Sequence, residues 1–90
     1  MKPEERDSLQ KEVERAHLAK QVLDNPVYSD AWQAMDRKLL GVMTNVGSDD
    51  DMVLEARRAL QILRRLKVEL ETEIKSGDMS AQQLAKANKG

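Results

Sequence analysis

Apolar residues recur along most of the chain every three or four positions, which is the spacing of one face of an α-helix. The clearest run alternates steps of four and three residues, and its members are Tyr28, Trp32, Met35, Leu39, Val42 and Val46. No segment has the two-residue alternation that is typical of a β-strand. The pattern therefore predicts an all-α protein whose helices pack along narrow apolar seams.

Residues that cap or stop helices divide this pattern into three parts. The predicted helices span about residues 4–23, 26–44 and 51–75. Asn25 and Pro26 separate the first two, because proline disfavours helix at the residue before it and suits the first position of the next helix. Gly77 is predicted to end the third and longest helix, since glycine is the commonest residue just beyond a helix.

Residues 1–77 are thus predicted to form one helical domain, either a three-helix unit or a helical hairpin with a long third helix. The remaining residues, 78–90, are predicted to form a short terminal helix or a frayed tail. Ser80 and Gln83 have the spacing of a capping box, but only Met79 and Leu84 could dock this segment.

The apolar stripes predict which side chains pack together and which do not. The predicted packing residues are Trp32, Met35, Leu39, Leu63, Leu66 and Leu70. Leu54, Ile62 and Val68 fall outside the main stripe of the third helix, although isolated apolar residues on a surface are common. Together they give the helix apolar side chains on more sides than a small bundle can cover. We therefore predict a homo-oligomer, with these three residues as candidate contacts between chains.

Composition limits the classes of protein that remain. With 90 residues and 2% aromatic residues the core is thin, so a partner subunit would help to stabilise it. A net charge of −1 gives the whole molecule no attraction to nucleic acid or to anionic membranes. No apolar run approaches the roughly 18 residues of a membrane span, and the first residues lack the apolar stretch of a signal peptide. We expect a soluble, cytoplasmic protein with no membrane partner.

No pattern in the chain indicates catalysis or a cofactor. Glu14 and His17 have the Glu-x-x-His spacing of di-iron helical bundles, but such a site needs two of these motifs and the chain has one histidine. The acidic run Asp49–Asp51 lacks the alternating ligands of a calcium loop and is better explained as a helix cap. We therefore predict no catalytic, metal or cofactor-binding residue, and a protein that is not an enzyme.

One cluster of positive charge supports a rival interpretation. Two arginine pairs lie seven residues apart on the third helix, at Arg57, Arg58, Arg64 and Arg65, with Lys67 beside them. Five phosphate contacts would give nucleic-acid binding a salt dependence with a slope near −4.5, at about 0.9 per contact. No aromatic residue stands among them to stack on bases, and three glutamates follow directly. We favour an ion-paired or solvated face over a nucleic-acid-binding or regulatory module.

Several segments together resemble a known class of viral protein. The stretch from Arg15 to Trp32, a later Leu-Leu doublet and the stretch from Arg57 to Leu66 resemble small helical proteins encoded among the virion genes of tailed bacteriophages. The resemblance covers about residues 15–77 and includes no active-site motif. It implies an accessory protein of phage head or tail assembly, found in the host cytoplasm or the virion, with other phage structural proteins as possible partners.

Overall fold

The computed structural model describes residues 1–89, which form three α-helices joined by two short connections. The helices are α1 (Pro3–Asp24), α2 (Pro26–Thr44) and α3 (Asp50–Lys89). No strand occurs among the described residues, so the predicted all-α class and the long third helix are confirmed.

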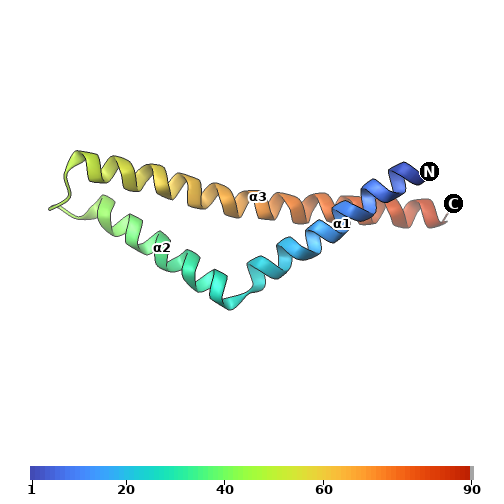
Figure 1. Ribbon diagram of the computed structural model, residues 1–90, viewed down its shortest axis with the longest axis horizontal. Helices are drawn as coiled ribbons and strands as arrows, with labels where there is room; N and C mark the ends of the chain where they lie inside the picture. The colour runs from blue at the N-terminus through green and yellow to red at the C-terminus, as the bar shows by residue number, and fades with distance from the viewer. Residues whose placement is uncertain (90) are drawn as a thin grey trace.

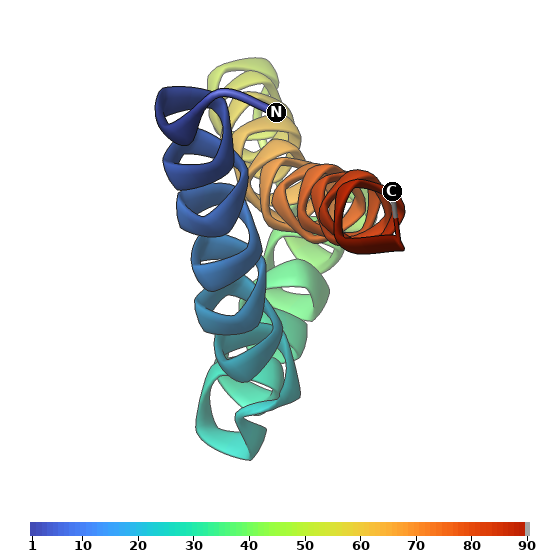
Figure 2. The ribbon, with the colours of Figure 1, turned by 90° about the vertical axis from the view of Figure 1, so that its right-hand side faces the viewer.

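The three helices form a bent hairpin (Figure 1). α1 and α2 meet in an open V, and α3 runs back along both arms, so that the two ends of the described chain lie at the same end of the molecule. The molecule measures 64 × 24 × 15 Å, and the 40 residues of α3 account for about 60 Å of its length at about 1.5 Å per residue. A cross-section taken at any point along the length of the molecule therefore contains two helices, which are α3 and either α1 or α2. Within residues 1–89 no further helix covers the remaining sides of α3 (Figure 2).

Side-chain caps explain two of the helix starts. The side-chain oxygen of Asn25 accepts hydrogen bonds from the backbone N–H groups of Val27 at 2.9 Å and Tyr28 at 3.3 Å, with Pro26 as the first residue of α2. In the same way, Asp49 accepts a hydrogen bond from the backbone N–H of Met52 at 2.8 Å. These contacts satisfy N–H groups that have no partner within the first turn of a helix.

The predicted end of the third helix at Ser76–Gly77 is wrong. α3 continues through both residues to Lys89, and Gly77 has no positive φ, the backbone conformation that a terminating glycine adopts. Gly77 is instead a buried residue in contact with α1. Its small size serves close helix packing at this position, a role that the sequence rule for helix ends does not consider.

The segment predicted as a short or frayed tail is likewise part of α3. Residues 78–89 add three helical turns, and Gly90 lies outside the described residues. Ser80 and Leu84 of these turns are buried and half-buried. The structure therefore shows no boundary at residue 77, because α1 packs against both sides of that position.

Few side chains are fully buried. Among residues 1–89 the buried apolar residues are Ala16, Ala19, Ala56 and Leu60, and no large side chain is completely enclosed. Of the predicted packing residues, four are half-buried: Trp32, Leu39, Leu63 and Leu70. Met35 and Leu66 remain 46% and 49% exposed, so they do not lie in a core within this chain. The reason is that a pair of helices covers only one side of each apolar stripe.

Candidate functional site: an open apolar face

The contact between α1 and α3 is closest where small residues meet. Gly77 lies against Ala16, and a Cβ atom added to Gly77 would overlap the Cβ of Ala16 and approach the carbonyl oxygen of Glu12 to 3.1 Å. One turn further along α3, the hydroxyl of Ser80 donates a hydrogen bond to the carboxylate of Glu12. Ser80 is only 2% exposed, so this polar contact lies inside the helix interface. It holds α1 at a fixed position along α3.

Trp32 makes the corresponding contact between α2 and α3. Its indole Nε1 donates a hydrogen bond to the backbone carbonyl of Leu63 at 3.1 Å. The ammonium of Lys67 lies 4.7 Å from the centre of the indole ring, within the range of a cation–π interaction. Trp32, one of the predicted packing residues, is therefore held by two groups of α3.

Two ion pairs also join α3 to the arms of the V. Arg15 of α1 lies 3.0 Å from Glu73, and Arg64 of α3 lies 3.3 Å from Asp36 of α2. Both arginine side chains are largely exposed, so each pair is expected to add at most about 1 kcal/mol of stability.

Two apolar grooves open on one and the same side of the hairpin. The residues of α3 that mark this side recur every seven positions, at Met52, Ala59, Leu66 and Glu73. The first groove, between α1 and α3, is lined by Arg15, Leu18, Ala19, Val22, Leu66, Glu69, Leu70 and Glu73. The second, between α2 and α3, is lined by Leu39, Val42, Met52, Glu55, Ala56 and Ala59. We call this side of the molecule the open apolar face.

Several large side chains on this face are exposed. Leu18 is 61% exposed, Leu66 is 49% exposed, and Val22 and Met52 are also exposed. Ile62 lies one turn before Leu66 on α3 and is 71% exposed. The apolar stripes predicted Leu66 as a packing residue, and Leu18 was not among the predicted packing residues. The four-residue spacing of Leu18 and Val22 was the signal that could have identified this second apolar edge.

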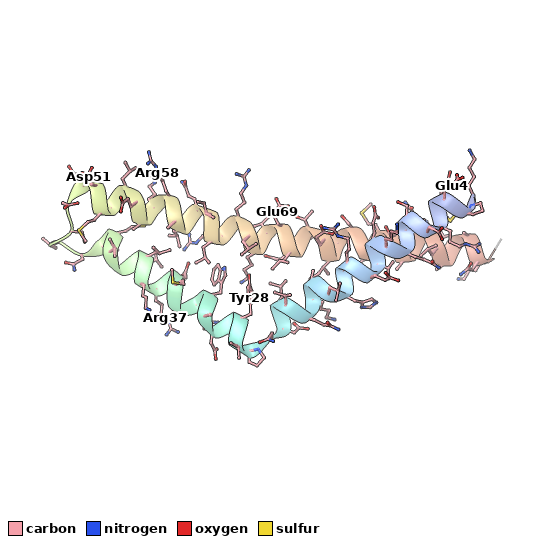
Figure 3. The ribbon with its side chains drawn as sticks, viewed as in Figure 1. Glu4, Tyr28, Arg37, Asp51, Arg58 and Glu69 are labelled. Carbon is pink, nitrogen blue, oxygen red and sulfur yellow. The ribbon has the colours of Figure 1, made fainter. Side chains whose placement is uncertain are left out.

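The opposite side of the hairpin is more polar. It holds the Arg64–Asp36 ion pair and a depression of about 210 Å³ lined by Leu23, Tyr28, Ser29, Trp32, Gln33, Lys67 and Glu71. Tyr28 lies in the angle between the V and α3 (Figure 3), and its buried hydroxyl has no hydrogen-bond partner in the described part of the chain. The two broad sides of the molecule therefore differ in character, and the open apolar face has the more apolar grooves.

The predicted self-association residues do not share one surface. Leu54 and Val68 are exposed and 14 residues apart, which places them on one edge of α3 that faces away from both arms. Ile62 lies nearer to Leu66 and the open apolar face. The structure thus separates one of the three candidates from the other two.

The four arginines of the rival interpretation are also divided. Arg64 is paired with Asp36, whereas Arg57, Arg58 and Arg65 form no ion pair within residues 1–89. Arg58 projects from the edge of α3 that faces away from α2 (Figure 3). The four side chains therefore do not act as one continuous positive strip.

The structure offers no metal site among the described residues. No group of three or more potential metal ligands comes together in residues 1–89, and Glu14 and His17 are both exposed. Asp49 caps α3, as expected for the acidic run.

Comparison with protein-family models, with curated proteins and with solved structures found no match for this chain. Among the described residues, no helix combines the length and the apolar character that crossing a membrane requires.

Proposed function

We propose that this protein is a non-enzymatic structural or assembly subunit that acts by associating with further copies of itself. The observation that supports this role is the two-helix cross-section of the molecule. A hairpin of this kind leaves apolar side chains uncovered on α1, α2 and α3, including Leu18, Met35 and Leu66.

The dimensions of the chain support the same proposal. Its accessible surface is 7183 Å², whereas a compact monomer of 10.2 kDa would expose about 5,300 Å². Its radius of gyration is 18.9 Å, against about 12 Å for a compact domain of this length. The chain has therefore folded its helices without collapsing them into a globule, as expected for a subunit that completes its core with a partner.

The proposed setting rests on the resemblance of residues 15–77 to small helical proteins of tailed phages. On that basis we propose an accessory role in phage head or tail assembly, in the host cytoplasm or in the virion, with other phage structural proteins as further partners. An elongated helical unit that buries apolar surface only on assembly would suit such a role.

Light scattering combined with sedimentation, over a concentration series of the purified chain, tests self-association directly. The proposal expects a dimer or larger species at micromolar concentration, together with a strongly helical circular dichroism spectrum. A helical protein that remains monomeric up to high micromolar concentration would overturn the proposal.

The rival function is a nucleic-acid-binding or regulatory module, and one observation favours it. Arg57, Arg58 and Arg65 are exposed and form no ion pair in the described part of the chain, so they could contact phosphates. Arg64 is less available because it is paired with Asp36. Nucleic-acid binding that weakens steeply as salt rises, measured by titration, would separate this function from self-association.

A further inference from the structure

We infer that the open apolar face is the surface on which a second copy of this chain packs, forming a dimer with four helices at each level. This inference rests on the proposed self-association and names the surface that carries it. The residues that we place at its centre are Leu18, Val22, Ile62 and Leu66.

The surface that the chain leaves exposed matches the size of a stable interface. The chain exposes roughly 1,900 Å² more surface than a compact monomer of its mass. Obligate dimers bury about 1,000–2,500 Å² on each partner. An obligate dimer interface on one broad side of the hairpin would therefore bury about as much surface as this chain exposes in excess of a compact monomer.

The apolar side chains of this face are continuous along α3. Met52 and Ala59 line the groove beside α2, and Leu66 lines the groove beside α1 at the same seven-residue spacing, so the face runs along both arms of the V. Helices with such a seven-residue repeat pack side by side in bundles. Two hairpins placed face to face would turn each half-covered seam into the interior of a four-helix bundle.

The rim of this face carries charges of both signs. α3 contributes Glu55, Glu69 and Glu73 to the grooves, and α1 contributes Arg15, which is paired with Glu73 of the same chain. Lys11 and Glu4 lie seven and fourteen residues before Leu18 and so on the same line of α1. An apolar centre inside a charged rim is the arrangement that protein–protein interfaces share.

The test compares charged substitutions on the open apolar face with one on the outer edge of α3. L66E and L18E place a carboxylate on the face from two different helices, and V68E is the matched control because Val68 is 56% exposed on the same helix as Leu66. Sedimentation of each variant over a concentration series gives the dimer Kd, and circular dichroism reports whether the helices persist.

We expect L66E and L18E to raise the dimer Kd by roughly a hundredfold or more, because each would bury an unpaired charge between the copies. V68E should change the Kd by less than about threefold. Because the two face variants lie on different helices, a loss of helicity in one leaves the other as the test.

The outcomes separate this inference from the function on which it rests. If the unchanged chain associates and both face variants associate equally well, the inference is overturned and the proposed function stands. The same holds if only V68E disrupts association, which would place the interface on the outer edge. If the unchanged chain is monomeric at high micromolar concentration, both are overturned, and the face is open to solvent or to a different partner.

Discussion

Gly77 and Ala16 touch across the interface of α3 and α1 with no room between them for a methyl group. This contact lies in the middle of a continuous helix, and Ser80 bonds to Glu12 one turn further along. Close approach at Gly77 allows α1 to lie deep enough on α3 for that hydrogen bond to form.

Replacing Gly77 by alanine should therefore destabilise the protein by about 1–3 kcal/mol, because the added methyl group would overlap Ala16. Helix propensity alone would make the alanine variant more stable by about 1 kcal/mol. A loss of stability would therefore report the steric overlap with Ala16 and not helix propensity. Urea denaturation at a single protein concentration measures the change. Gly41→Ala is the matched control, because nothing lies within 4 Å of a Cβ atom at Gly41, and it should stabilise by about 0.5–1 kcal/mol. Equal stabilisation by both changes would contradict the close contact.

Ser80→Ala should destabilise the protein by about 1–2 kcal/mol, because it removes the hydrogen bond that the buried Ser80 hydroxyl donates to the Glu12 carboxylate. Thr72→Ala removes a hydroxyl from the same helix that bonds only to the carbonyl of Val68, and it should change stability by less than about 0.5 kcal/mol. The two free energies of unfolding are compared by urea denaturation. A similar effect at both positions would show that residues beyond Gly77 do not hold α1.

Tyr28→Phe should be neutral or slightly stabilising, because the buried hydroxyl of Tyr28 has no hydrogen-bond partner among residues 1–89. Trp32→Phe should instead cost about 1–3 kcal/mol, since it removes the hydrogen bond to Leu63 and weakens the contact with Lys67. Thermal unfolding followed by circular dichroism distinguishes the two. A marked loss of stability in Tyr28→Phe would indicate a partner for the hydroxyl that this structure does not contain.

Asn25→Ala should cost about 1 kcal/mol, because two backbone N–H groups at the start of α2 lose their acceptor. Asn25→Gly should cost only a few tenths of a kcal/mol. Lys2 occupies the same position before α1 but makes no side-chain cap, so Lys2→Ala is expected to have little effect. Urea denaturation measures the free energy of unfolding of the three variants. We expect the largest loss in Asn25→Ala, a smaller loss in Asn25→Gly and the smallest in Lys2→Ala.

Binding to nucleic acid would separate the two proposed functions. If Arg57, Arg58, Arg64 and Arg65 each contact a phosphate, the logarithm of the binding constant should fall against the logarithm of salt concentration with a slope of about −3.6. We expect no such binding near physiological salt, because Arg64 is committed to Asp36 and Arg57 lies on a different line of α3 from Arg58 and Arg65. Fluorescence anisotropy with labelled DNA and RNA measures it. A steep slope that disappears on changing Arg57, Arg58 and Arg65 to glutamine would favour the rival function.

Local sequence was sufficient to predict the class of fold and most helix boundaries. The separation of α1 from α2 follows from Asn25 and Pro26, whose effects act within a few residues, and the turn before α3 follows from the capping carboxylate of Asp49. These boundaries agree with the prediction to within about one residue, as expected for signals that do not depend on the rest of the fold.

The end of α3 could not be predicted in this way. Gly77 reads as a helix stop because glycine commonly follows a helix, and only the position of Ala16 on another helix reveals its role in packing. Leu66 posed a similar problem, since helical spacing shows that a residue belongs to an apolar stripe but not how many helices cover that stripe.

The sequence by itself thus determined that the chain is helical, where α2 begins and which residues form each apolar stripe, because these depend on backbone conformation and on neighbours within a turn. Only the tertiary structure decided that α3 continues past Gly77, that Arg64 is paired with Asp36, and that Leu18 and Leu66 share one open face. Each of these depends on contacts between residues that are 28 or more positions apart, and such contacts are set by how the helices pack together.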